Sequence, residues 1–250
     1  MVTNGRTYLV ILLIAFAFAA CDKKTDNTTY PFTISFQNKA GNTDLILADT
    51  YTNLFGEIIK ITTFKYYITN ISVVTNTGSV IAIPETYYLV DQNIPSSLHF
   101  TVNTTADKIQ ALRFLIGVDS THNVSGVQTG ALDPVNAMFW TWNTGYIMAK
   151  LEGKSPQSTQ PLTAVTYHIG GFKTGENTVH PVSLSLPTPL LLSTTATSEV
   201  IINADAMKWF NGVNAIKIAD NAYTATPGPL AVSISENYAT MFSVGEVINR

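Results

Sequence analysis

The sequence contains one cysteine, Cys21, among 250 residues. A disulfide needs two thiols, so none can form within a single chain. A metal site built from several cysteine thiolates is excluded for the same reason. Cys21 must therefore be explained by its position in the sequence rather than by a partner in the same chain.

Charged residues are also scarce. Asp, Glu, Lys and Arg together make up 12% of the chain and leave a formal net charge of −3, whereas about 25% is usual for a soluble domain. The sequence has no basic stripe, so nucleic acid is not an expected partner. Threonine, serine and asparagine supply the missing polarity, and this composition favours strands and turns over long helices.

Common catalytic motifs are absent from the sequence as well. It contains no Gly-x-Ser-x-Gly, no His-Glu-x-x-His, no Walker-type loop and no Cys-x-x-Cys, which are the motifs that mark common hydrolase, zinc, nucleotide and redox sites. No pair of titratable groups stands out as an acid and a base. We therefore expect that the chain is not an enzyme.

The first twenty residues have the organisation of an export signal. Arg6 precedes an apolar run from Tyr8 to Ala20, which is shorter than the roughly 20 residues that span a bilayer as a helix. A basic start, a short apolar core and small residues before the cleavage point are typical of a secretory signal, here residues 1–20.

The position of Cys21, directly after this signal, is similar to that of the lipidated cysteine in a bacterial lipobox. We expect a lipid on Cys21, a polar flexible tether over residues 21–31, and an exported, membrane-anchored lipoprotein on the periplasmic face or at the outer membrane. An ordinary signal peptide with an incidental cysteine is the alternative.

From Phe32 onward the pattern is that of one β domain, residues 32–250. Apolar residues alternate with polar ones, which is the two-residue repeat of a strand. Asn and Gly, Asp-Pro, Pro-x-Pro and Pro-Gly-Pro turn signals separate the runs. We expect an all-β fold, an antiparallel β-sandwich with long loops and one or two short helices, over 203–210 and 236–242. The alternating runs are Phe32–Phe36, Phe64–Ile68, Leu112–Val118 and Val182–Leu186.

The segment with the most residues that could carry a function runs from Ile116 to Gly153. Its first half is a long loop, and long loops are often functional. Its second half is predicted to be a strand on which Met138, Trp140 and Trp142 share one face. Two interpretations remain open: this face is sandwich core, or it is a ligand surface that stacks on a sugar or joins a histidine in a metal site.

Several characteristic segments follow one another in a fixed order: Phe64–Ile71, Gly117–Ser120, Leu132–Pro134, Met138–Tyr146, Tyr167–Gly171 and Asn237–Phe242. Together they give the chain a resemblance to the MbnP-like family, which is named for the periplasmic partner of methanobactin-type copper systems. The resemblance covers the chain from about Phe32 to the C-terminus.

The resemblance implies copper as a cofactor, with a tryptophan oxidised to kynurenine by a diheme peroxidase-like partner. An intact indole N–H is a donor only and a poor ligand, whereas the aryl amine of an opened ring has a free lone pair suited, with imidazole and thioether, to copper. The metal residues implied in this sequence are His168, which is the first candidate, together with Trp142, Trp140, Met138 and His122.

The sequence departs from the family pattern in the first strand. Family members often carry a histidine there in a Phe-x-His context, and Asn38 stands at that place here. Either the site is rebuilt from the remaining histidines, or copper binding has been lost. The alternative function is a non-metal binding module for a glycan or for another protein of the cell envelope.

Overall fold

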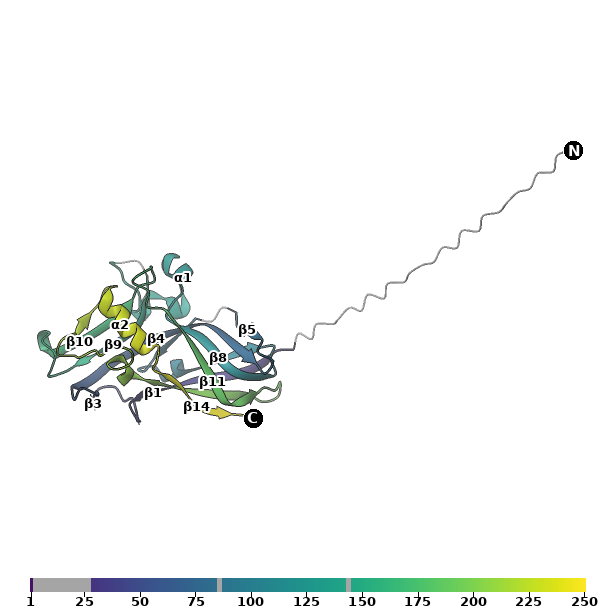
Figure 1. Ribbon diagram of the computed structural model, residues 1–250, viewed down its shortest axis with the longest axis horizontal. Helices are drawn as coiled ribbons and strands as arrows, with labels where there is room; N and C mark the ends of the chain where they lie inside the picture. Colours follow the sequence, from purple (N-terminus) through teal and green to yellow (C-terminus); the bar gives the residue numbers. More distant parts are fainter. Residues whose placement is uncertain (2–27, 85–86, 143–144) are drawn as a thin grey trace.

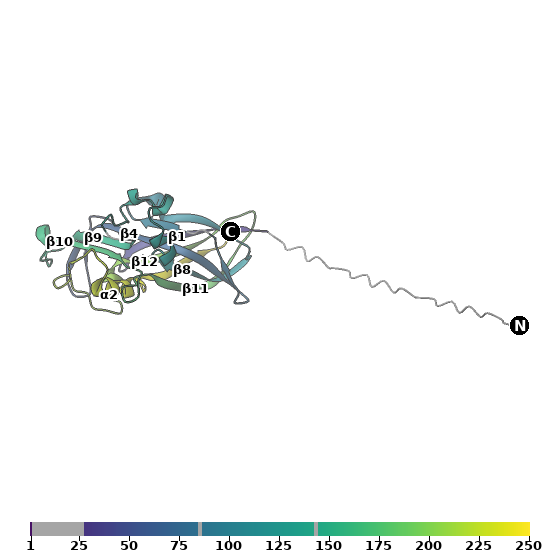
Figure 2. The same cartoon turned by 90° about the horizontal axis from the view of Figure 1, so that it is seen from above.

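Two β-sheets packed face to face form the body of the protein (Figures 1 and 2), which confirms the predicted all-β sandwich with few helices. The computed structural model describes residues 1, 28–84, 87–142 and 145–250. Residues 2–20 of the predicted signal peptide, Cys21 with its predicted lipid, and most of the predicted tether lie outside the described residues.

The smaller sheet has the strand order β14–β12–β1–β2, and β7 also pairs with β1. The larger sheet has the order β11–β8–β4–β9–β10–β13, and β3, β5 and β6 also pair with β4. The smaller sheet comprises β1 (Tyr30–Ala40), β2 (Thr43–Asp44), β7 (His99–Thr104), β12 (Ser198–Asp205) and β14 (Phe242–Ile248). The larger comprises β3 (Thr50–Thr52), β4 (Ile58–Thr75), β5 (Val80–Ala82), β6 (Tyr87–Asp91), β8 (Lys108–Ile116), β9 (Ile147–Lys154), β10 (Ala164–Gly170), β11 (His180–Leu191) and β13 (Tyr223–Thr224).

The helices are short. The two α-helices are α1 (Ser120–Val124) and α2 (Pro229–Tyr238), and the 3-10 turns are η1 (Pro95–Leu98), η2 (Gly130–Leu132), η3 (Pro134–Asn136), η4 (Pro161–Thr163) and η5 (Ala206–Trp209). Figure 1 shows α1 at the edge of the molecule and α2 lying over the strands of the larger sheet. Within the described part of the chain, none of these helices has the length and apolar character needed to cross a membrane.

Most neighbouring strands run antiparallel, as predicted, but two pairs do not. Strands β1 and β12 pair in parallel from Phe32↔Ser198 to Lys39↔Asp205, and β10 and β13 also pair in parallel. Strands β1 and β12 are far apart in the sequence, so no hairpin connects them and their relative direction is not fixed by a turn. Turn signals therefore could not indicate this pairing.

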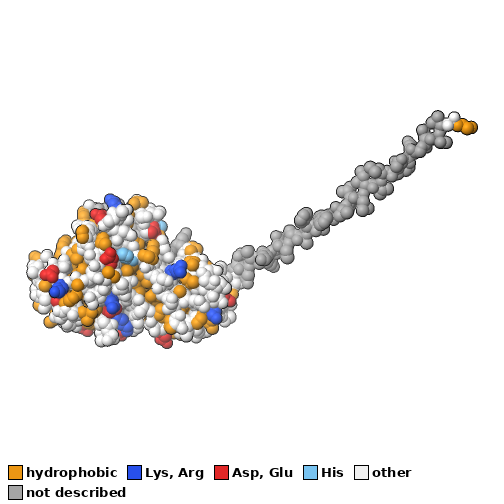
Figure 3. Space-filling model, in the orientation of Figure 1, with side chains coloured by type: hydrophobic (Ala, Val, Ile, Leu, Met, Phe, Trp, Pro, Cys, Tyr) orange, Lys and Arg blue, Asp and Glu red, His pale blue; other side chains and the backbone are white. Residues whose placement is uncertain are grey.

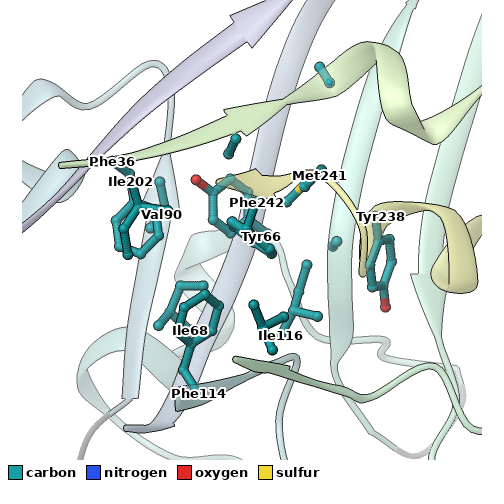
Figure 4. Close-up of a cluster of buried hydrophobic side chains, with 14 of the residues drawn as sticks. Phe36, Tyr66, Ile68, Val90, Phe114, Ile116, Ile202, Tyr238, Met241 and Phe242 are labelled. Carbon is teal, nitrogen blue, oxygen red and sulfur yellow. The ribbon is translucent and has the colours of Figure 1, made fainter. Parts of the chain in front are cut away.

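The alternating runs predicted from the sequence bury one face, as expected of half-buried strands. Figure 4 shows side chains of both sheets and of the C-terminal segment converging in one core. The ring of Phe36 on β1 lies 5.9 Å from that of Tyr66, 6.0 Å from that of Phe100, and 6.4 Å from those of Phe114 and Phe242. Phe36 thus joins the smaller sheet to the larger one.

Strand β4 is the central strand of the larger sheet, and its middle part, Tyr66–Thr69, is buried on both faces. Tyr66 and Tyr67 are adjacent and both fully buried, although successive strand residues point to opposite sides. Tyr66 lies in the main core, whereas Tyr67 belongs to a second group of buried apolar side chains. We call this second group the outer cluster; it consists of Tyr67, Val118, Leu132, Met138, Trp140, Tyr146, Ile147 and Met148.

Both predicted helices are placed wrongly. Strand β12 continues to Asp205, whose side chain accepts from the backbone N–H of Met207 and starts a single 3-10 turn, so no helix covers 203–210. The second helix begins at Pro229, not after Ser235. Proline at the first helical position is favourable because its missing N–H needs no partner there, and the Pro-Gly-Pro sequence marks this helix start.

Two smaller boundaries also differ from the predictions. Strand β1 begins at Tyr30, inside the predicted tether 21–31, because its backbone pairs with β7 as far as Tyr30↔Thr104. The expected turn at Pro187–Pro189 lies within β11, where the register against β8 shifts between Ser185 and Leu190. Proline donates no N–H to a ladder, which suits it to such an irregularity.

We predict that Phe36→Ala lowers the free energy of unfolding by about 3–5 kcal/mol, because it removes a ring that contacts both sheets and leaves a cavity. Leu54→Ala is the matched control: Leu54 is 76% exposed, and its truncation should change the free energy by less than about 0.5 kcal/mol. Urea unfolding followed by circular dichroism measures both. Equal effects of the two substitutions would contradict the assignment of Phe36 to the core.

Candidate functional site

Residues 117–142 and 145–146, which we call the covering segment, fold over the outward face of the larger sheet and supply most of the outer cluster. Its last part is a narrow hairpin. The N–H of Ile147 donates to the carbonyl of Met138 at 2.8 Å, the N–H of Trp140 donates to the carbonyl of Gly145 at 3.3 Å, and Phe139 and Tyr146 form an isolated bridge. The predicted strand through Trp142 is therefore wrong, because regular pairing starts only with β9 at Ile147.

The two neighbouring tryptophans have different environments. Trp140 is 4% exposed and Trp142 is 61% exposed, while their ring centroids lie 5.5 Å apart. The backbone bends at Thr141 and Trp142, which breaks the two-residue repeat on which a shared face depended. Met138 and Trp140 are thus buried in the outer cluster, and Trp142 lies at the surface against Trp140.

Gly170, the last residue of β10, makes room for the indole of Trp140. A Cβ atom at Gly170 would lie 2.5 Å from Cη2 of Trp140 and 2.7 Å from the carbonyl oxygen of Tyr146. No side chain fits at those distances, so the indole lies directly on the strand backbone. The Gly-Gly pair of the sequence is explained here by packing.

The buried Nε1 of Trp140 has no hydrogen-bond partner among the described residues. Buried polar groups usually have a partner, and one that lacks it costs about 1–3 kcal/mol. Trp209, in the main core, provides a contrast, since its Nε1 donates to the sulfur of Met241 at 3.4 Å. Trp140 therefore presents a free N–H next to the exposed ring of Trp142.

Two lysines attach the loop in front of this hairpin to the sheet. Lys150 of β9 donates to the carbonyl of Ala137 at 2.6 Å, and Lys65 of β4 donates to the carbonyl of Asn136 at 3.4 Å. Lys65 also forms an ion pair with the buried Asp91 at 2.8 Å. Burial lowers the pKa of Lys150. The two ammonium groups hold the end of η3, and thereby the start of the hairpin at Met138.

His168 lies on the outward face of β10 and pairs with Glu152 of β9, with 2.7 Å between Nε2 and Oε1. In the strand register His168 is opposite Lys150, and Glu152 is opposite Thr166. The imidazole therefore leans towards the Thr166 side, away from Gly170 and the indole upon it. The hydrogen bond from His168 lowers the pKa of Glu152 to about 2.

His122 lies on α1 and has a different carboxylate partner, Asp119. Its Nδ1 is 3.0 Å and 3.1 Å from the two carboxylate oxygens and 2.7 Å from the hydroxyl of Tyr87, which also donates to Asp119. Partial burial would raise the pKa of Asp119, but the hydrogen bonds from Tyr87 and His122 outweigh it and lower the pKa. Burial and the bond to Asp119 raise the pKa of Tyr87.

Asn38, at the place of the expected histidine, is buried on the inward side of the sandwich. Its Nδ2 donates to Gln92 at 2.8 Å, and its Oδ1 accepts from the hydroxyl of Tyr66 at 2.8 Å. Tyr66 faces the main core, whereas Tyr67 faces the outer cluster. The larger sheet therefore separates position 38 from Trp140, and Asn38 serves a hydrogen-bond network of the core.

The five predicted metal residues are thus only partly brought together. Met138, Trp140 and Trp142 share one hairpin, while His168 and His122 each bind a carboxylate of their own. In the described part of the chain, no group of three or more His, Cys, Asp or Glu side chains is arranged to hold a metal. The unmodified residues of the tryptophan hairpin therefore do not form a complete donor set for copper.

Sequence reasoning missed the roles of four residues that shape this region: Lys65, Lys150, Glu152 and Tyr87. Lys65, Glu152 and Tyr87 come from strands far in sequence from the histidines and the hairpin that they contact. A local pattern could not reveal them, because strand register and not sequence spacing brings them there. The buried position of Lys150 follows from the loop that covers β9.

The charged side chains are scattered over the face of the molecule shown in Figure 3, and no broad patch of one sign appears on that face. A two-sheet β domain with an aromatic hairpin on the outer face of its larger sheet is the class of protein that these observations define. A family model named MbnP matches residues 29–228, so the chain belongs to the MbnP family. Membership associates it with the copper systems for which the family is named.

A solved structure, MbnP from Methylosinus trichosporium, aligns with a TM-score of 0.55 and 16% sequence identity, covering 87% of this chain and 99% of that chain. At this identity the likeness shows a shared fold. No curated protein matches the chain.

We predict that Gly170→Ala displaces the Trp140 indole and destabilises the fold by about 1–3 kcal/mol, the usual effect of inserting a methyl group into a packed site. In a Trp142→Phe background, the added exposure of Trp140 should red-shift tryptophan emission and increase acrylamide quenching. Thr166→Ala, four residues earlier on the same strand, adds no atom and is the control. Unchanged quenching in Gly170→Ala would contradict the packing of Trp140 on this glycine.

The pair of His168 and Glu152 predicts a pH dependence of stability. The pKa of Glu152 in the folded chain is about 2, below its ordinary value of 4.5. Its contribution is therefore complete above the unfolded-state pKa and is lost as the pH falls towards 2. Because solvent screens this partly exposed pair, we expect a contribution of about 1 kcal/mol.

The comparison that isolates this contribution is Glu152→Gln, which lacks the titrating carboxylate. Urea unfolding between pH 6 and pH 2, roughly the window set by the two pKa values, should show a steeper loss of stability in the native chain than in the variant. Parallel pH profiles would show that the pair does not act in the folded state.

Proposed function

We propose that the chain is a copper-handling lipoprotein of the cell envelope that binds copper through a nitrogen released when the indole of Trp142 is opened. Family membership supports the copper system. The observation that carries the site is the contact between an exposed Trp142 and a buried Trp140 whose Nε1 has no described partner. In this proposal the chain is held to the membrane by a lipid on Cys21 and is not itself an enzyme.

The exposure of the two rings supports Trp142 as the one that is oxidised. At 61% exposure it is accessible to another protein, whereas Trp140 is 4% exposed and packed on Gly170. The oxidant we propose is a diheme peroxidase-like partner that uses hydrogen peroxide. Two peroxide molecules supply the two oxygen atoms of N-formylkynurenine and leave two waters, and hydrolysis then releases formate and leaves kynurenine.

In this proposal the N–H of Trp140 donates a hydrogen bond to the modified side chain. Kynurenine carries an aryl ketone in place of the indole carbon–carbon double bond, and a ketone oxygen is a hydrogen-bond acceptor. An opened ring at position 142 therefore offers an acceptor to a donor that has no partner among the described residues. Trp140 then orients the modified side chain, so that the new aryl amine has a fixed direction.

Copper, when bound, supplies a soft Lewis-acid centre that suits aryl amine, imidazole and thioether donors. His168 is the imidazole we propose from β10, with Met138 and His122 as further candidates from the covering segment. In this proposal Nδ1 of His168 is the ligand atom, since Glu152 holds Nε2 at 2.7 Å. Glu152 then becomes the group that sets the orientation and basicity of the imidazole.

We predict that Trp142 of the protein purified from its native envelope carries one oxygen atom more and one carbon atom fewer than tryptophan. Peptide mass spectrometry measures this, and metal analysis after dialysis should find copper in the same preparation. Trp209, buried and bonded to Met241, is the internal control and should be unmodified. A chain made without the redox partner should keep three intact tryptophans.

Intact Trp140 and Trp142 in native protein, together with no copper after dialysis, would overturn the proposal. Modification at Trp140 in place of Trp142 would retain the copper function but refute the role we derive from exposure. Native-host variants Trp142→Phe and Trp140→Phe separate these outcomes, because only the substitution at the modified position should remove the copper that depends on a modified tryptophan.

The 61% exposure of Trp142 also favours a second candidate function, a non-metal module for a glycan or for another envelope protein. An exposed indole supported from below by another ring is a suitable stacking platform. A glycan array with the unmodified chain and with Trp142→Ala tests this candidate. Binding that needs the intact indole and no metal would favour it over copper handling.

A further inference from the structure

Three potential metal ligands meet at one edge of the covering segment. They are the carboxylate of Asp119, Nδ1 of His122 and the hydroxyl of Tyr87, and they come from two separate parts of the chain. Nδ1 lies 3.0 Å and 3.1 Å from the carboxylate oxygens and 2.7 Å from the phenol oxygen. The phenol also donates to the second carboxylate oxygen. The group is thus a closed triangle of donor atoms.

The size of this triangle is close to that of one face of a metal coordination shell. Zinc binds histidine nitrogen and carboxylate oxygen at about 2.0–2.2 Å, and tetrahedral geometry then places adjacent ligand atoms about 3.4 Å apart, so the triangle has to widen by about half an ångström to receive the ion. The same groups would otherwise have to share their protons, because the phenol has a single proton and lies close to two acceptors. A cation can replace those shared protons without moving the side chains far.

The local backbone holds the triangle in place. Oδ1 of Asp119 accepts from the backbone N–H of His122 at 3.1 Å, and Nδ2 of Asn123 donates to the carbonyls of Val118 and Asp119. The ring of Tyr87 lies 4.3 Å from that of His122. Such supporting contacts orient first-shell ligands. The carboxyl and imidazole side chains remain 20% and 34% exposed, so water can complete a coordination shell.

We propose that Asp119, His122 and Tyr87 form a binding site for a divalent metal ion of the zinc and copper class. One imidazole nitrogen, one carboxylate and one phenol suit this class, whereas calcium takes six to eight oxygen ligands. The site goes beyond the proposed function, because it needs no tryptophan oxidation and lies on α1 and β6 rather than on the tryptophan hairpin.

The test uses Cu²⁺ as the probe and the chain produced without a diheme partner, with intact tryptophans confirmed by mass spectrometry. Isothermal titration against a glycine competitor gives the affinity, and electron paramagnetic resonance reports nitrogen coordination. We expect binding of one Cu²⁺ with one imidazole nitrogen, and displacement of bound Zn²⁺ by Cu²⁺. Asp119→Asn and His122→Gln should each weaken binding more than about 10-fold, the lower range for losing even a supporting contact of a metal site.

The variants are chosen to keep the fold. Asparagine at 119 is as good a helix N-cap as aspartate, so α1 keeps its cap while the anionic ligand is lost. Tyr87→Phe tests the phenol and should also weaken Cu²⁺ binding. His180→Gln is the matched control, since this histidine bonds to Ser235 elsewhere in the fold, and it should leave the affinity unchanged.

Absence of Cu²⁺ binding, or binding that is unchanged in both Asp119→Asn and His122→Gln, would overturn this site. Neither outcome bears on the modified tryptophan, because the tested chain carries none. The two proposals share His122 as a candidate ligand, and the material tested separates them. Cu²⁺ binding by the chain with intact tryptophans reports on this site, whereas the mass of the tryptophans in the native protein reports on the proposed function.

Discussion

The burial of the middle part of β4 on both faces is the constraint on which the rest of the structure depends. A sheet in a two-layer sandwich normally packs one face and exposes the other to water. Here Tyr66 faces the main core and its neighbour Tyr67 is equally buried on the other side. A third layer over the outward face is therefore required, and the covering segment supplies it.

This third layer is attached by polar contacts as much as by apolar packing. Lys65 and Lys150 donate to consecutive carbonyls at the end of η3, and Oδ1 of Asn123 accepts from the N–H of Tyr146 at 2.8 Å. These bonds pair backbone groups of the loop that would otherwise lie without partners over an apolar surface. The position of the tryptophan hairpin is thus set by side chains that do not belong to it.

The sequence predicted the two-sheet class because the alternation of apolar and polar residues in runs such as Phe32–Phe36 depends only on neighbouring residues. It also indicated the segment from Ile116 onward as the region of interest. The prediction that Met138 and Trp142 share one face was wrong, because it assumed a strand where the backbone bends. The partners Glu152 and Tyr87 could not be foreseen, since register across the sheet brings them to His168 and His122.

The separation of the two imidazole–carboxylate pairs has a chemical consequence for any metal that the chain binds. Each carboxylate lies within hydrogen-bond distance of its imidazole, so a cation bound at that imidazole would be close to a negative charge. At His122 a phenol adds a third donor to the pair. At His168 the third position must come from the covering layer, whose exposed member next to Trp140 is Trp142. Three donors meet at His122 and only one carboxylate meets His168, so under the proposed function only the second place requires a modified indole.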